Sequence, residues 1–265
     1  MKVALCQIDT ILGKIDRNIV KISNYVDKAI YDKCDMVVFP ELALSGYGLR
    51  DLVFDVALKS DDSFFDEVKQ KSKDIDIVFG YVEEDGGYTY NSALYFSKGN
   101  MVYNYRKNFL PDYGMFEEGR YFASGNTIDT IETDFGKVTL FICEDSFHIS
   151  AQDIAFQNNT DILIILSASP FWMDSKSIKP DLWKSVCSNF TQLSGSYAIF
   201  ANRVGFEDGV GFFGNSFVMD TDGNIIKEAK MFKEEMLIVE FDERLVLKAK
   251  SKMPILKNEV ARYAY

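Results

Sequence analysis

The chain contains 265 residues, of which 47% are hydrophobic and 26% are charged. This balance is typical of a soluble globular protein and excludes disordered, collagen-like and coiled-coil architectures. The formal net charge is −11, and because nucleic-acid phosphates are bound mainly by Lys and Arg, we expect no nucleic-acid partner. No apolar run approaches the ~18 residues that a membrane span needs, and the apolar stretch at the N-terminus is too short for a signal peptide. We therefore expect a cytoplasmic protein without a membrane partner.

The elements expected in the first half of the chain begin with a strand–helix–strand unit. Buried strands are expected at 2–8 and 36–39, with a helix between them that is capped by Asp16 or Asn18. A long connection runs from Glu41 to about residue 60. After it we expect a helix at 64–72 and strands at 75–81, 89–96 and 101–105.

The second half of the chain is predicted to add strands, a helix and a hairpin. These elements are a strand pair at 127–133 and 137–142, a buried strand at 161–166, a helix at 180–193, a strand at 197–202, a hairpin of 215–220 and 224–227, and a strand at 236–241. Since no linker, low-complexity stretch or repeat divides the chain, we expect one domain, residues 1–265. Its fold class is α/β, with a mixed sheet or a pair of sheets covered by helices.

Glycines at 209, 211 and 214 match the dinucleotide-binding pattern in spacing alone. They lead into an apparent strand, whereas that motif opens a helix, so we interpret them as an ordinary loop.

Cysteine and histidine usage limits the chemistry. The four cysteines form no CxxC pair, which argues against a structural zinc site and a disulfide framework. The single histidine, His148, excludes a multi-histidine metal site, and we expect no metal and no cofactor. Cys143 lies only five positions before His148, whereas catalytic Cys–His pairs come from distant segments. We therefore expect His148 to be structural or at the surface.

Three chemically distinct side chains follow apolar, strand-like runs. Glu41 follows MVVFP, Lys107 follows MVYNYR and Cys143 follows VTLFI. Open α/β sheets bind ligands beyond the carboxyl ends of their strands. Taken singly, Glu41 and Lys107 can also be interpreted as solvated charges, and Cys143 as a buried inert thiol. Together they form a coherent set, because a carboxylate takes a thiol proton and an ammonium stabilises a thiolate and then an oxyanion.

Several blocks of the sequence resemble the nitrilase, or carbon–nitrogen hydrolase, superfamily. They are FPELALSGY (39–47), YRKNFLPDYGMFEEGRYF (105–122), LFICEDSF (140–147), LSASPFW (166–172), ANRVG (201–205) and FFGNSFVMDTDG (212–223). The sequences of these blocks are most similar to the glutaminase domain of glutamine-dependent NAD synthetases, whereas FFGNSF is also similar to amidases that act on N-carbamoyl amines. The resemblance implies a four-layer α-β-β-α sandwich that pairs into homodimers or higher homo-oligomers.

The resemblance also implies the roles of individual residues. By motif, Glu41 is the general base, Lys107 the oxyanion-stabilising lysine and Cys143 the nucleophile. Glu118, two residues after Phe116, matches a second glutamate of the family. The implied reaction is hydrolysis of a non-peptide C–N bond in a small amide through a cysteine thioester, without a metal or an organic cofactor.

The sequence constrains the identity of the substrate less than it constrains the type of reaction. Tyr113, Phe171 and Trp172 are candidate pocket aromatics, and Glu144 and Asp145 are candidate ligands for a substrate amine. Ordinary packing or dimer contacts are the alternatives for the three aromatics, and a structural role is the alternative for Glu144. Three functions stay open: an amidase for glutamine-like or N-carbamoyl substrates, a nitrilase, and a catalytically silent binding or scaffold protein on the same fold.

Overall fold

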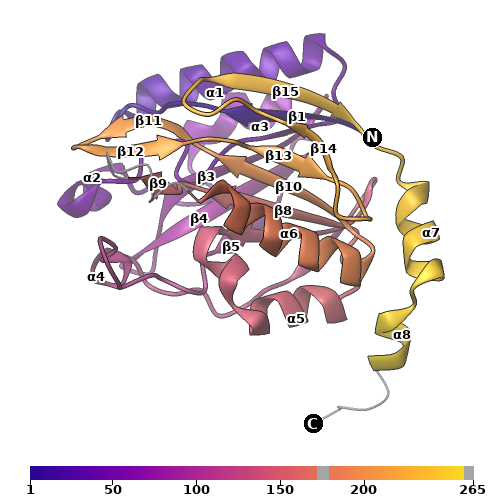
Figure 1. Ribbon diagram of the computed structural model, residues 1–265. Helices are drawn as coiled ribbons and strands as arrows, with labels where there is room; N and C mark the ends of the chain where they lie inside the picture. The colour runs from indigo at the N-terminus through magenta and orange to yellow at the C-terminus, as the bar shows by residue number, and fades with distance from the viewer. Residues whose placement is uncertain (172–178, 260–265) are drawn as a thin grey trace.

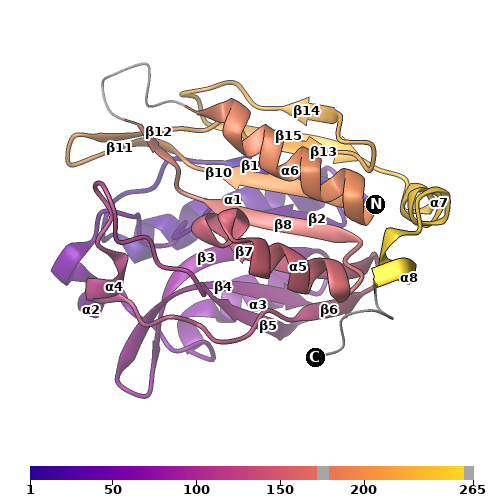
Figure 2. The same cartoon turned by 60° about the horizontal axis from the view of Figure 1, so that its bottom comes forward.

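The computed structural model describes residues 1–171 and 179–259. Two six-stranded sheets pack against each other, and helices cover their outer faces (Figures 1 and 2). This arrangement confirms the four-layer α-β-β-α sandwich. Trp172 lies outside the described residues.

The first sheet has the order β15-β1-β2-β3-β4-β5. Its strands are β1 (Lys2–Gln7), β2 (Met36–Val38), β3 (Asp76–Asp85), β4 (Tyr88–Ser97), β5 (Asn100–Arg106) and β15 (Glu235–Glu240). β1, β2 and β3 run parallel, and the remaining pairs are antiparallel. Helices α1 (Ile15–Tyr31) and α3 (Asp66–Lys71) lie on the outer face. Helix α1 buries Ile22, Val26 and Ala29 against this sheet because they recur at helical spacing.

The second sheet has the order β14-β13-β10-β8-β7-β6. Its strands are β6 (Thr130–Thr133), β7 (Gly136–Ile142), β8 (Ile162–Ser167), β10 (Tyr197–Asn202), β13 (Phe217–Met219) and β14 (Ile225–Glu228). β7, β8 and β10 are parallel, and β8 and β10 read as continuous apolar runs because both of their faces are buried. Helices α5 (Ile149–Gln157) and α6 (Pro180–Ser194) cover the outer face (Figure 2).

Smaller elements surround the edge where the parallel strands end. They are a three-stranded sheet of β9 (Pro170–Phe171), β11 (Val204–Glu207) and β12 (Val210–Phe213), the short helices α2 (Val53–Val56) and α4 (Glu118–Tyr121), and the 3₁₀ turns η1 (Arg50–Leu52) and η3 (Cys143–Phe147). A further 3₁₀ turn, η2 (Ser63–Phe65), leads into α3. Gly209 lies in the turn between β11 and β12, and Gly211 lies on β12. The glycine pattern therefore opens no helix, as predicted.

The predicted cap of the first helix is wrong. Helix α1 begins at Ile15, so Asp16 and Asn18 already lie inside it. Asn18 is buried, and its side chain bonds the backbone N–H and C=O of Ile11 and the C=O of Leu44. It therefore fastens two loops to the helix rather than capping it.

Five helices were not expected from the sequence: the short helices α2 and α4, and the helices α5, α7 and α8. Helix α5 has no clear apolar stripe, since Ile149 and Ile154 are both exposed. Helices α7 (Arg244–Lys252) and α8 (Ile255–Glu259) extend along one side of the sandwich (Figure 1). Among residues 1–171 and 179–259, no helix is long and apolar enough to cross a bilayer.

Candidate active site

Glu41 follows β2 and is completely buried. Its Oε1 accepts hydrogen bonds from Asn91 Nδ2 at 2.8 Å and Lys107 Nζ at 2.9 Å, and its Oε2 accepts one from the backbone N–H of Ala168 at 2.7 Å. An ionised carboxylate offers about four lone-pair sites. Three donors thus fix the orientation of this carboxylate and leave one lone pair on Oε2 for a further proton.

Lys107 lies just beyond β5 and is also completely buried. Its Nζ donates to Glu41 Oε1 at 2.9 Å and to Glu118 Oε1 at 2.8 Å. Burial opposes the charged form, but the carboxylates of Glu118 and Glu41 outweigh it and raise the pKa of Lys107 well above its ordinary value. The amine is therefore an ammonium with one of its three N–H groups left over from these two bonds.

Glu118 begins α4 and is 5% exposed. Its Oε1 accepts from Tyr47 OH at 2.5 Å as well as from Lys107, while its buried Oε2 meets no partner among the described residues. Burial raises the pKa of Glu118 to about 7, and Lys107 opposes that rise. Its neighbour Glu117 has 68% of its side chain exposed and faces Arg120 at 3.9 Å. Of the two adjacent glutamates, Glu118 is thus buried against Lys107, whereas Glu117 is exposed to solvent.

Cys143 is the first residue after β7 and is half-buried. Its φ of +46° is in the left-handed region, which non-glycine residues adopt at a cost in tight turns and functional sites. Burial and the charge of Glu41 raise the pKa of the Cys143 thiol, while Lys107 lowers it. The thiol therefore carries its proton at neutral pH and needs a base before it attacks.

The end of β8 links the thiol to the glutamate. Ser167 Oγ lies 3.6 Å from Cys143 Sγ, and the next residue, Ala168, donates its N–H to Glu41. Ser169 donates its N–H to Asn202 Oδ1, at the end of β10. The structure thus brings together groups at or just beyond the ends of β2, β5, β7 and β8.

Asp145 holds the cysteine turn in place. This completely buried carboxylate accepts hydrogen bonds from the backbone N–H groups of Ile142, Asn108 and Phe109 and from Tyr105 OH, at 2.7 to 3.1 Å. It ties the turn after β7 to the segment after Lys107. Burial raises the pKa of Asp145 to about 6, and its hydrogen bonds oppose that rise.

Two of the candidate substrate residues contact each other. Tyr113 is 56% exposed and donates its OH to Glu144 Oε2 at 2.7 Å. The other oxygen of Glu144 lies 3.6 Å from His148 Nε2. The His148 ring stacks on Phe109 with centroids 3.7 Å apart, which agrees with a structural histidine.

Phe171 lies on β9, in the small sheet. Its ring packs edge-on against Phe206 and Phe232, with centroids 5.8 and 5.2 Å away. Among the residues that the structure describes, no group of three or more His, Cys, Asp or Glu side chains is placed to hold a metal ion.

Asn91, Ser167 and Ala168 were not identified from the sequence. Ser167 is the last residue of the buried apolar strand β8 and Ala168 follows it, so their position at a strand's carboxyl end was an available signal. Asn91 is a completely buried amide in the middle of β4. A polar residue within a strand pattern is informative only once its partner is known, and the partner is 50 residues away.

Comparison with known proteins places this geometry in context. The sequence profile of the carbon–nitrogen hydrolases matches residues 2–250. The glutamine-dependent NAD(+) synthetase of Acinetobacter baylyi is 32% identical over 243 residues, which cover 91% of this chain and 44% of the synthetase. The chain thus spans less than half the length of this synthetase.

Two solved structures share the fold. The glutamine-dependent NAD+ synthetase of Acinetobacter baumannii superposes with a TM-score of 0.82 at 32% identity, over 92% of this chain and 46% of the synthetase. A carbon–nitrogen hydrolase from Helicobacter pylori superposes with a TM-score of 0.89 at 26% identity, over 99% of this chain and 97% of that protein. With the profile match, these likenesses show that the chain belongs to the carbon–nitrogen hydrolase family of nitrilase-superfamily enzymes.

Proposed function

We propose that the protein hydrolyses the C–N bond of a small amide through a thioester on Cys143. The observation that carries the proposal is the buried Lys107 ammonium, which donates to both Glu41 and Glu118 at 2.9 and 2.8 Å. A buried cation between two carboxylates, beside a thiol on a strained turn, is a costly arrangement that an inert protein has no reason to keep.

Formation of the thioester begins with a proton transfer. The free lone pair on Glu41 Oε2 accepts the Cys143 proton, and the thiolate attacks the amide carbonyl carbon. The remaining N–H of Lys107 donates to the oxyanion of the tetrahedral intermediate. Donors of this kind typically contribute on the order of 10²–10³ in rate.

Collapse of the intermediate breaks the C–N bond. Glu41 returns the proton to the leaving nitrogen, which departs as ammonia or an amine, and the acyl group remains on Cys143. Glu41 then removes a proton from a water molecule that attacks the thioester carbonyl. The acid is released, and the sulfur recovers its proton from Glu41.

We propose an ω-amide of the glutamine type as the substrate class. The support is that several relatives are named glutamine-dependent NAD(+) synthetases. N-carbamoyl amines and nitriles are the alternative substrates, and a catalytically silent scaffold is the non-enzymatic one.

The test combines turnover with labelling of the thiol. Ammonia release is measured for ω-amides, N-carbamoyl amines and nitriles, and we expect turnover with one of the ω-amides. Iodoacetamide should alkylate one thiol per chain, Cys143, and the best substrate should slow the labelling. Cys6, Cys34 and Cys187 are buried and serve as internal controls. No turnover with any class, or labelling that spares Cys143, would refute the proposal.

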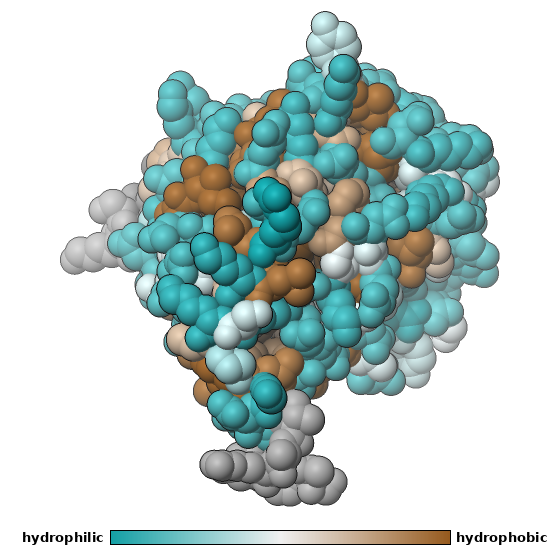
Figure 3. Space-filling view, turned by 90° about the vertical axis from the view of Figure 1, so that its right-hand side faces the viewer, coloured by the Kyte–Doolittle hydropathy of each residue, from teal (hydrophilic) through white to brown (hydrophobic). Residues whose placement is uncertain are grey.

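We also propose that the protein is a homodimer. Exposed apolar side chains gather on the helices of the second sheet and on α7; they include Ile149 (83% exposed), Leu193 (48%) and Leu247 (71%). Figure 3, which faces the side of α7 and α8, shows apolar areas between hydrophilic side chains. Light scattering at micromolar concentration should give twice the mass of one chain, and the mass of a single chain would exclude the dimer.

A further inference from the structure

Tyr47 extends the catalytic network beyond the residues named so far. Its OH donates at 2.5 Å to Glu118 Oε1, the same oxygen that accepts from Lys107. Its ring packs edge-on against Phe116 and Phe212, with centroids 6.4 and 6.0 Å away. Burial and the charge of Glu118 raise the pKa of Tyr47 well above its ordinary value. The phenol therefore stays a donor over the whole working pH range.

Packing alone leaves Tyr47 partly unsupported. A cavity of about 480 Å³ borders Tyr47, Glu118, Glu207 and Phe212. A side chain beside open space keeps its position only if other interactions hold its backbone, because a cavity provides no contacts.

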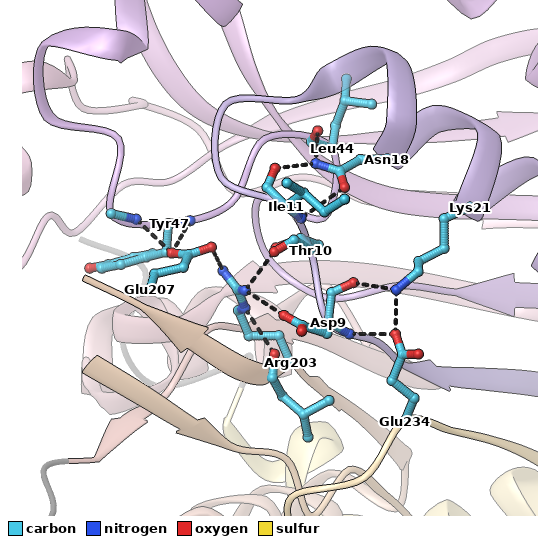
Figure 4. A network of polar contacts seen from close by, with 12 residues as sticks. Asp9, Thr10, Ile11, Asn18, Lys21, Leu44, Tyr47, Arg203, Glu207 and Glu234 are labelled. Carbon is cyan, nitrogen blue, oxygen red and sulfur yellow. Dashed lines mark hydrogen bonds and ion pairs between the residues drawn. The ribbon is translucent and has the colours of Figure 1, made fainter. Parts of the chain in front are cut away.

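The carboxylate of Glu207 supplies that support. Its Oε2 accepts the backbone N–H of Tyr47 at 3.0 Å and that of Gly48 at 2.9 Å (Figure 4). Gly46 has a φ of +82°, and a Cβ at that position would stand 2.5 Å from Glu207 Oε1. Only glycine therefore allows the loop to approach this carboxylate so closely.

Glu207 is itself held by a buried cation. Arg203 is completely buried and pairs through Nη1 with Glu207 Oε1. Its other terminal nitrogen lies 3.4 Å from both Asp9 Oδ1 and the C=O of Thr10, and its guanidinium stacks over the Phe212 ring at 4.2 Å. Figure 4 shows this continuous path from the N-terminal loop through Arg203 and Glu207 to Tyr47.

We propose that Tyr47 is a positioning residue that holds the Glu118 carboxylate against Lys107, and that Glu207, fixed by Arg203, positions Tyr47. This inference rests on the proposed function, since it acts through Glu118. The charged and titratable groups that face Glu118 are Lys107, Glu41, Tyr47 and Cys143. Of these, Tyr47 alone acts as a neutral donor, so its removal weakens the hold on Glu118 without changing the charge of the site.

The first experiment compares Tyr47→Phe with Tyr95→Phe. Tyr95 also donates from a buried phenol to a carboxylate, Asp76 Oδ2 at 2.6 Å, and is therefore a matched control on β4. Tyr47→Phe should lower kcat about tenfold with KM nearly unchanged. The acid limb of its pH–rate profile should also move upward, because the phenol lowers the pKa of Glu118. Tyr95→Phe should lower the Tm but change neither kcat nor the profile.

The second experiment tests whether Glu207 acts through Tyr47. Glu207→Asp keeps the charge that compensates Arg203 but shortens the reach to the Tyr47 backbone. We expect Glu207→Asp to lower kcat and to move the acid limb of the pH–rate profile upward, as Tyr47→Phe does. The double variant Tyr47→Phe/Glu207→Asp should have a kcat only slightly below that of Tyr47→Phe alone. If the two effects on kcat multiply, Glu207 does not act through Tyr47.

A purely structural role for Tyr47 is also recognisable. If Tyr47→Phe matches Tyr95→Phe in kcat and in pH profile, the positioning role is wrong, and this comparison decides it even if Glu207→Asp fails to fold. Failure of the proposed function gives a different pattern, since the unmodified protein would then turn over none of the substrate classes, or Cys143→Ala would keep full activity.

Discussion

Substitution of Glu118 by glutamine removes one negative charge from the site and keeps the shape of the side chain. In the native protein, Glu118 Oε1 accepts from Lys107 at 2.8 Å and from Tyr47 at 2.5 Å, and the residue is 5% exposed. Hydrogen bonds to charged groups contribute ~1.5–3 kcal/mol each. After the substitution, the Lys107 ammonium keeps only one anionic partner, Glu41.

We expect Glu118→Gln to lower kcat about a hundredfold, which corresponds to about 2.7 kcal/mol of transition-state stabilisation. The physical reason is that the remaining N–H of Lys107 reaches the oxyanion only while the other two are held. The matched control is Glu117→Gln at the preceding position. Its side chain is 68% exposed and 3.9 Å from an equally exposed Arg120. Exposed pairs contribute little, so we expect a change of less than about twofold.

The assay is steady-state ammonia release by both variants on the best substrate, with thermal unfolding as the test of folding. Equal and small losses in the two variants would refute the reasoning and assign Glu118 to a structural role. A large loss confined to KM would also contradict it, because an interaction with the oxyanion appears in kcat.

Three further substitutions and conditions are informative. Cys143→Ala should abolish turnover and leave the circular dichroism spectrum unchanged; residual activity above a small fraction would exclude the thioester. Burial raises the pKa of Glu118 to about 7, so kcat/KM should fall as the pH drops through about 7 and this carboxylate is protonated. If Glu118→Gln shows the same fall of kcat/KM at low pH, the fall belongs to the titration of another group. Asn91→Ala removes a 2.8 Å bond to Glu41 and should lower kcat about tenfold. Ser92→Ala, at the next position of β4, removes a 2.7 Å bond to Glu83 on β3 and should lower only the Tm. Similar kinetics for those two variants would show that Asn91 does not orient the base.

The sequence by itself determined where most of the strands lie and that the fold class is α/β, whereas the order of the strands in each sheet came from the structure. Continuous apolar runs such as 36–39 and 161–166 predict buried parallel strands, because both of their faces must meet apolar partners. The runs at 36–40 and 138–142 likewise place Glu41 and Cys143 just beyond a strand, where local sequence alone identifies them as candidates. The resemblance in the blocks at 39–47 and 140–147 then supplied the fold.

The resemblance selects Glu118 rather than its neighbour by motif, but only the tertiary structure shows the physical difference between residues that look alike in the sequence. Glu117 and Glu118 are adjacent and chemically identical, yet one is 68% exposed and the other meets Lys107. The acidic pair at 144 and 145 divides in the same way, since Asp145 is enclosed by backbone donors. Nothing in the local pattern encodes these differences.

The physical reason is that these contacts join segments far apart in the chain. Ala168 meets Glu41 across 127 positions, and Glu207 meets Tyr47 across 160. A buried charge is tolerated only where a partner of opposite charge or a hydrogen-bond donor already stands. Which glutamate becomes buried is therefore decided when the two sheets and their loops pack together, and propensity and periodicity act only within each element.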